Sequence, residues 1–134
     1  MNKIDVVNKT RKRISEVLVR KVARKTMATS LREPRNFWLT VVFVGKKEIW
    51  KLNQIYRRKN KSTDVLSFDY SSGYNKIGGE LFLCPEVIEK SARSHKVSFQ
   101  KELAFVLSHG MLHLLGMKHW RKMYKIQDEI AKNM

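Results

Sequence analysis

The chain has almost no cysteine, the residue whose disulfides stabilise many secreted proteins. It contains a single cysteine, Cys84, in 134 residues, so no disulfide can form within one chain. This scarcity is typical of proteins of the reducing cytoplasm, where we expect this protein to act. Cys84 ends an apolar run, and we expect its thiol to be a small buried side chain.

Long hydrophobic runs and flexible linkers are also lacking. The longest apolar stretch, residues 37–44, is far too short to span a bilayer, and the first five residues lack the apolar core of a signal peptide. The two prolines, Pro34 and Pro85, stand at the ends of predicted elements, and there is no repeat or low-complexity tract. We therefore expect one domain over residues 1–134, with no membrane association.

Acidic residues are scarce compared with basic ones. The chain has 12 Asp and Glu against 28 Lys and Arg, which gives a net charge of +16. A charge this large indicates polyanionic partners, with nucleic acid as the first candidate; an anionic membrane surface, or a basic protein without such a partner, are the alternatives. Residues 1–36 carry 11 basic and 3 acidic side chains, so this basic N-terminal strand and helix region is predicted to contact RNA backbone.

The hydrophobic periodicity predicts alternating strands and helices. Strands are predicted at residues 4–8, 37–44, 62–68 and 80–84, and helices at residues 9–27, 46–56, 86–94, 98–115 and 122–132. The third and fourth strands follow each other without an intervening helix, which implies at least one antiparallel pairing. We therefore predict an α+β fold, a mixed sheet of about four strands with helices packed on it.

Three of the four histidines, His109, His113 and His119, fall within eleven residues. His109 and His113 are four residues apart, so a helix places their rings on one face, one turn apart. Gly116 allows the backbone to leave the helix and bring His119 toward them. Three protein ligands and an open fourth position are how a catalytic zinc is held, so we predict one Zn²⁺ per chain at the end of a long core helix.

Two histidines on a helix are more often hydrogen-bonded than metal-bound. The third histidine and the helix-breaking glycine favour the metal here, because histidines that project from an apolar helix need polar partners or a metal. A zinc peptidase of the H-E-x-x-H type is disfavoured, since Gly110 occupies the position of the catalytic glutamate.

The sequence around these histidines resembles a known family. Residues 109–119, H-G-M-L-H-L-L-G-M-K-H, resemble the zinc signature H-G-x-L-H-L-x-G-x-x-H of the YbeY family, bacterial endoribonucleases of rRNA maturation. Residues 52–57 and 63–68 resemble its L-N-x-x-Y-R and T-D-V-L-S-F segments. Residues 79–81 and 123–130 are similar to its G-D-I strand start and its closing helix. The resemblance covers residues 49–130 and draws little on the first 36.

The chain departs from the family pattern at a few positions. Lys118 stands where the family usually has Asp, which puts a positive charge beside the third histidine. Glu80 replaces Asp in the strand start. Ser62 and Asp69 replace residues that are commonly proline, and we expect them to affect loop stiffness rather than chemistry.

The resemblance implies a zinc-dependent, single-strand-specific endoribonuclease of rRNA maturation, including 16S rRNA 3′ end processing, and of ribosome quality control. Its partners would be rRNA and the small ribosomal subunit, together with ribosomal proteins or a ribosome-associated GTPase. The alternative is a ribosome-associated rRNA-binding factor with a structural zinc and no nuclease activity. A metal-dependent hydrolase of another substrate, such as a peptide, is disfavoured by Gly110.

The resemblance also assigns residues to roles. Arg57, with His109 and His113, is predicted to be catalytic, because it matches the family's functional arginine and phosphodiester cleavage needs positive charge near the developing oxyanions. It could instead bind phosphate only. Arg57, Arg58, Lys59 and Lys61 are predicted to bind RNA. Thr63, Asp64 and Ser67 either position substrate, orient a histidine, or cap the strand and loop. His95 lies outside the motif and is predicted to be a surface residue.

Overall fold

The computed structural model describes residues 2–29, 36–72 and 76–116. Its elements, in chain order, are β1 (Asn2–Asn8), α1 (Glu16–Thr29), β2 (Asn36–Phe43), α2 (Lys46–Arg57), β3 (Val65–Asp69), β4 (Lys76–Leu83), α3 (Pro85–His95) and α4 (Phe99–Leu114). The strand order is β1-β2-β4-β3; β1, β2 and β4 run parallel, and β3 runs antiparallel to β4. The predicted α+β fold with a mixed four-stranded sheet is therefore confirmed.

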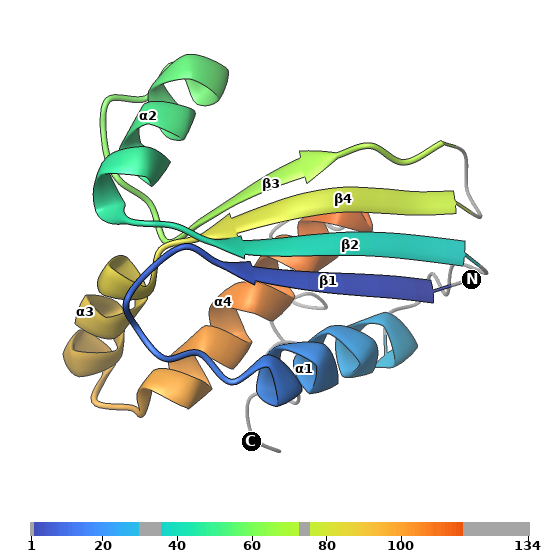
Figure 1. The fold of residues 1–134 in the computed structure, drawn as a ribbon, viewed down its shortest axis with the longest axis horizontal. Coiled ribbons are helices and arrows are strands. Elements are labelled where there is room, and N and C mark those ends of the chain that lie inside the picture. The colour runs from blue at the N-terminus through green and yellow to red at the C-terminus, as the bar shows by residue number, and fades with distance from the viewer. Residues whose placement is uncertain (1, 30–35, 73–75, 117–134) are drawn as a thin grey trace.

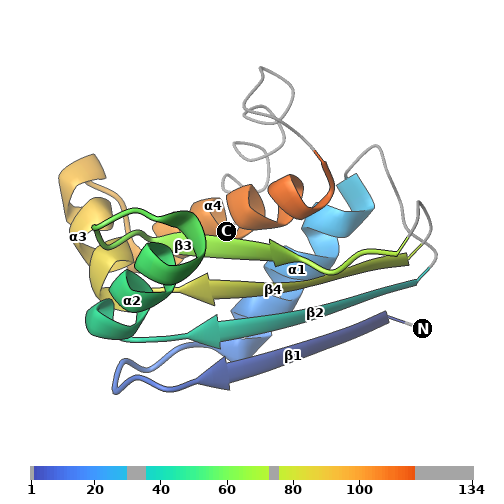
Figure 2. The same cartoon turned by 90° about the horizontal axis from the view of Figure 1, so that it is seen from above.

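Helices lie on both sides of the sheet (Figure 1). α1 and α4 cover the face that we call the inner face, where Phe37, Leu39, Val41 and Phe43 of β2 join the main core. On the outer face, α2 packs Ile49 and Leu52 over a smaller cluster at one end of the sheet. Seen from above, α2 stands over that end alone, and no other described helix covers the rest of the outer face (Figure 2).

The central element is α4, which contacts α1, α3, β3 and β4. It begins at Ser98, whose Oγ accepts a hydrogen bond from the Lys101 backbone N–H at 3.1 Å. It ends before Gly116, whose φ of 82° is left-handed, as the sequence predicted. Most of its residues are buried, while Phe105, His109 and His113 are half-buried. Because these three are four residues apart, they form one strip on the helix surface.

Several predicted boundaries were wrong. The first helix was expected from residue 9 but begins at Glu16; Asn8 instead organises a polar loop, with its Nδ2 donating to the Lys12 carbonyl and its Oδ1 accepting from the Thr10 N–H. β3 begins at Val65 rather than at residue 62. β4 begins at Lys76, not residue 80, because its two glycines lie within the strand. The helix predicted at residues 122–132 lies outside the described residues.

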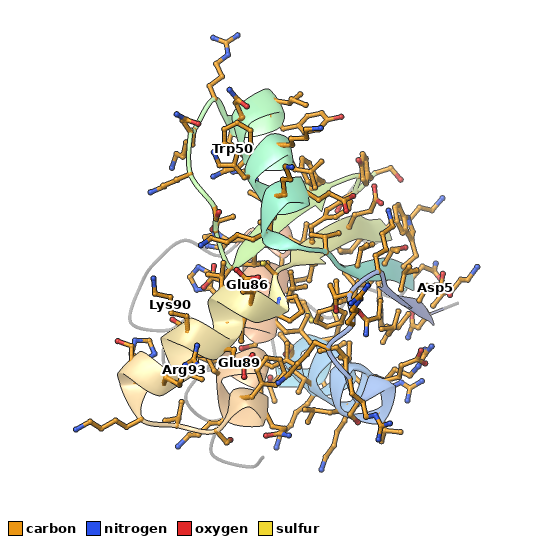
Figure 3. The ribbon with its side chains drawn as sticks, turned by 60° about the vertical axis from the view of Figure 1, so that its left-hand side comes forward. Asp5, Trp50, Glu86, Glu89, Lys90 and Arg93 are labelled. Atoms are coloured by element: carbon orange, nitrogen blue, oxygen red, sulfur yellow. The ribbon has the colours of Figure 1, made fainter. Side chains whose placement is uncertain are left out.

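The outward side of α3 carries charges of both signs, including Glu86, Glu89, Lys90 and Arg93 (Figure 3). Lys12, in the loop after β1, pairs with Glu89 at 3.5 Å and lies over the Phe99 ring at 4.6 Å from its centroid. Such exposed pairs are each worth at most about 1 kcal/mol. This loop therefore contacts both α3 and α4.

In the part of the chain that the structure describes, no helix is both long and apolar enough to span a membrane.

The Ser98 cap gives a prediction about α4. Replacing Ser98 with Ala removes the acceptor for the Lys101 N–H and should lower the free energy of unfolding by about 1 kcal/mol. Ser98→Asp keeps an acceptor at the same place, so its free energy of unfolding should remain close to that of wild type. Urea denaturation of the three proteins measures this, and equal midpoints for Ser98→Ala and wild type would contradict the assignment.

Candidate active-site cleft

An open cleft of about 600 Å³ lies where β3, α4 and the end of α2 meet. Its lining residues are Arg57, Thr63, Asp64, Val65, Leu66, Ser67, Asp69, Phe105, Val106, His109, His113 and Leu114. The sequence had singled out six of these residues, from three separate segments: Arg57, Thr63, Asp64, Ser67, His109 and His113. The fold therefore brings most of the predicted site to one place.

His109 and His113 converge at the floor of this cleft. Their Nε2 atoms lie 3.0 Å apart, and their ring centroids are 4.6 Å apart with the planes at 71°. This arrangement follows from the helix, which places residues i and i+4 on one face. The two nitrogens that are farthest from the backbone therefore meet at a single point.

The two rings fit a zinc ion in their donor atoms and their spacing. Two nitrogens bound to tetrahedral zinc, each at roughly 2.0–2.1 Å, lie about 3.3 Å apart. The observed 3.0 Å between the Nε2 atoms is close to that value. No set of three or more His, Cys, Asp and Glu side chains that could hold a metal occurs among the described residues. The third predicted ligand, His119, and its neighbour Lys118 lie outside them.

Gly110, between the two histidines, packs directly against the sheet. A Cβ added there would lie 3.0 Å from Cγ2 of Val65 and 3.2 Å from both Cδ2 of Leu81 and Oγ of Ser67. A glutamate at this position would have to project into this contact. The packing therefore gives a steric reason for a glycine at residue 110, and the peptidase alternative stays disfavoured by the absence of the glutamate.

Ser67 joins the walls of the cleft. Its Oγ donates to the carbonyl oxygen of Gly110 at 3.1 Å, and its own carbonyl accepts from Nη2 of Arg57 at 2.7 Å. The first bond ties β3 to α4 between the histidines, and the second holds the guanidinium at the cleft wall. The sequence left open whether Ser67 orients a histidine; the structure places its hydroxyl on the helix backbone instead.

The other predicted residues lie at or outside the rim. Thr63 and Asp64 line the cleft, and the Asp64 carbonyl accepts from the Cys84 N–H at 3.0 Å, which ties this wall to the end of β4. Arg58 has a left-handed φ of 54° and caps α2, and Arg58, Lys59 and Lys61 are exposed but do not line the cleft.

The remaining cysteine and histidine are apart from the cleft. Cys84 is fully buried, as predicted, and burial raises the pKa of its thiol, which favours the unreactive protonated form. His95 is 62% exposed, as expected of a surface residue, but its Nδ1 lies 2.9 Å from the buried Glu102 carboxylate.

Of the six other lining residues, Asp69 and Phe105 could have been assigned to the cleft from the sequence but were not. Asp69 was expected only to affect loop stiffness, yet it follows Val65 and Ser67 in period-two alternation and lines the cleft; its Oδ1 also accepts from the Ser71 N–H at 2.9 Å. Phe105 is one turn before His109 on α4. Period-two counting along β3 and period-four counting along α4 were the signals that could have identified them.

Gly110→Glu tests whether the packing leaves room for a side chain between the histidines. The substitution should lower the free energy of unfolding by at least about 3 kcal/mol, because it overpacks the contact with β3 and β4 and buries a charge. Gly45→Glu is the control, since a Cβ at Gly45 meets nothing within 4 Å. Chemical denaturation measures both; a Gly110→Glu protein as stable as the control would contradict this packing.

Known proteins are similar to this chain in sequence and in fold. Residues 4–134 match the family described as Endoribonuclease YbeY. A protein of that name from Bdellovibrio bacteriovorus is 40% identical over 119 residues, covering 84% of this chain and 77% of its own length. Another from Thermodesulfovibrio yellowstonii is 35% identical over 133 residues, covering 92% and 83%. A solution structure from Thermotoga maritima has a TM-score of 0.63 at 26% identity, covering 96% of this chain and 87% of that one.

The family match and these relatives support a nuclease of the endoribonuclease class. The chain belongs to the Endoribonuclease YbeY family. The family match begins at residue 4, so it includes β1 and α1, whereas the motifs recognised in the sequence began only at residue 49.

Proposed function

We propose that this chain is a zinc-dependent endoribonuclease that cleaves single-stranded rRNA with one zinc ion per chain. The observation that carries the proposal is the 3.0 Å approach of the His109 and His113 Nε2 atoms in a cleft that also holds Arg57. His119 would supply the third ligand. The chemistry that zinc supplies when bound is Lewis acidity and a hydroxide nucleophile near neutral pH.

The charges around the cleft support a cation there. Asp64 and Asp69 line it, and among the described lining residues the positive charge is that of the Arg57 guanidinium. Without a further positive charge, two carboxylates in this space would repel an RNA phosphate. A divalent cation held by the imidazoles reverses that balance and makes the cleft attractive to a phosphodiester.

Arg57 would bind and orient the phosphate. Its Nη2 is already committed to the Ser67 carbonyl at 2.7 Å, so the guanidinium is held in one orientation with donors left for a substrate oxygen. A fixed cation facing the oxygens on which charge develops stabilises the transition state more than the bound substrate. Arg58, Lys59 and Lys61 would contact RNA backbone beyond the cleft.

The wider proposal concerns where the enzyme acts. A net charge of +16 favours long polyanions, and we assign the chain to rRNA maturation, including the 16S rRNA 3′ end, and to ribosome quality control in the cytoplasm. Its partners would be the small ribosomal subunit, with ribosomal proteins or a ribosome-associated GTPase. The second candidate is an rRNA-binding factor with a structural zinc, favoured by cations such as Arg58 and Lys59 that lie outside the cleft.

His113→Ala separates these candidates. The enzyme predicts that zinc content falls from about one per chain to near zero, and that RNA cleavage falls by about 100-fold or more, because a ligand is lost. The rRNA-binding factor predicts instead that RNA affinity survives the substitution, since its basic surface is intact. His95→Asn is the control, because it removes a histidine outside the cleft. Zinc analysis, cleavage and RNA binding are measured on the same preparations. A wild type that holds zinc but cuts nothing above background would favour the binding factor.

Arg57→Ala tests the role of the guanidinium. We expect kcat to fall by about 10²–10³-fold with zinc content unchanged, because the cation facing the developing charge is lost. The matched control is Arg58→Ala, which removes the neighbouring guanidinium outside the cleft and should mainly weaken RNA binding. Steady-state kinetics on a single-stranded RNA measures both. Equal effects of the two substitutions on kcat would contradict a transition-state role for Arg57.

A further inference from the structure

The outer face of the sheet has an aromatic surface that the cleft does not explain. In β2, alternate side chains enter the core, but Trp38 points to the outer face and is 42% exposed. Tyr70, just after β3, is 54% exposed. Trp38 lies near the start of β2, whereas α2 covers the other end of that strand, at Val42 and Val44. The two rings adjoin each other rather than being scattered singly, and contiguous exposed apolar surface is a feature of interaction sites.

Both rings are held in place by β4. Trp38 lies opposite Gly78 in the sheet, and its indole covers that glycine so closely that an added Cβ would be 2.2 Å from Nε1. The Tyr70 N–H donates to the Gly78 carbonyl at 2.7 Å. The ring planes are within 12° of parallel, with centroids 5.9 Å apart. The pair, which we call the Trp38–Tyr70 platform, is therefore ordered before any ligand binds.

The charged groups beside the platform have both signs, and a cation is among them for an anion to bind. A hydrogen bond to the Glu80 carboxylate raises the pKa of the Tyr70 hydroxyl. Asp5, on the same face of β1, pairs with Lys3 at 3.7 Å. A hollow of about 180 Å³ beside the rings is also lined by Lys76, Asn36 and Ser72. It thus offers aromatic faces, an ammonium group and polar groups, which together suit a nucleotide.

The platform is continuous with the active-site cleft through an edge strand. β3 is the outermost strand on its side of the sheet, and Asp69, its last residue, lines the cleft. Tyr70, the next residue, belongs to the platform on the outer face. Consecutive Cα atoms are about 3.8 Å apart, so the two sites begin at neighbouring positions of the chain. An RNA strand that leaves the cleft across this edge meets the platform next.

We propose that the Trp38–Tyr70 platform binds unpaired bases of the RNA that flank the scissile phosphodiester in the cleft. The proposal rests on the proposed function, because it takes RNA as the ligand of the cleft. Sheet surfaces that recognise single-stranded RNA stack its bases on exposed aromatic rings in this way, while nearby cations hold the backbone. Base-paired RNA has no such faces to offer, so the platform selects single strands.

The test compares two RNA probes on the intact protein. One is a single-stranded oligonucleotide, and the other is the same sequence annealed to its complement. Trp38→Ala/Tyr70→Ala should weaken binding of the single strand by at least about 10-fold and leave duplex binding within about 2-fold of wild type. Zinc content should be unchanged, because neither ring lines the cleft.

Two further variants make the result specific. Trp38→Phe/Tyr70→Phe keeps the aromatic faces and should restore most of the single-strand affinity. Trp50→Ala removes a tryptophan of α2 instead and should bind as wild type does. Unchanged single-strand affinity in the double alanine variant overturns the proposal, and so does an equal loss for both probes. Loss of binding to the small ribosomal subunit with RNA affinity intact also overturns it, because a protein then occupies the platform.

The same experiment distinguishes failure of this proposal from failure of the proposed function. If wild type cuts no RNA but the double alanine variant loses affinity for the single-stranded probe and not for the duplex, the platform proposal is supported and the nuclease assignment is wrong. If wild type cuts RNA but the double alanine variant binds the single-stranded probe as tightly as wild type does, the nuclease assignment is supported and the platform proposal is wrong.

Discussion

The close packing of α4 against β3 and β4 at Gly110 is the contact on which the rest of the structure depends. It places the helix so near the sheet that Ser67 can bond to the Gly110 carbonyl at 3.1 Å. Because His109 and His113 flank that glycine, the same contact fixes where the two imidazoles project. Arg57 is then held opposite them through Ser67. One close approach of helix and sheet thus orders the three side chains to which we assign the proposed function.

The edge position of β3 links this cleft to the other side of the sheet. Side chains alternate along a strand, so Ser67 and Asp69 face α4 while Phe68 packs on the outer face against Tyr56 and Phe82. An edge strand exposes its border to solvent, so an RNA chain in the proposed cleft would reach both surfaces across it. The two proposed RNA sites would therefore hold a single strand on either side of the scissile bond.

Much of this could be read from the sequence, because the strongest signals are local. The i, i+4 histidines, the glycine at residue 116 and the β-branched run of β2 each specify their own conformation. The start of β4 was missed because Gly78 and Gly79 suggest a turn; only the partners Trp38 and Leu114 show that they are sites of close packing. Asp69 was missed because the third strand was expected to end at residue 68, so the alternation that places Asp69 with Val65 and Ser67 was not followed to its last member.

The most direct test of the account is X-ray absorption at the zinc edge on the purified wild-type protein. The account predicts about one zinc per chain, bound by about three imidazole nitrogens at roughly 2.0–2.1 Å, and no zinc in a His109→Ala/His113→Ala protein. A protein without zinc, or zinc that remains when both histidines are replaced, would show that the convergence of these rings has another purpose.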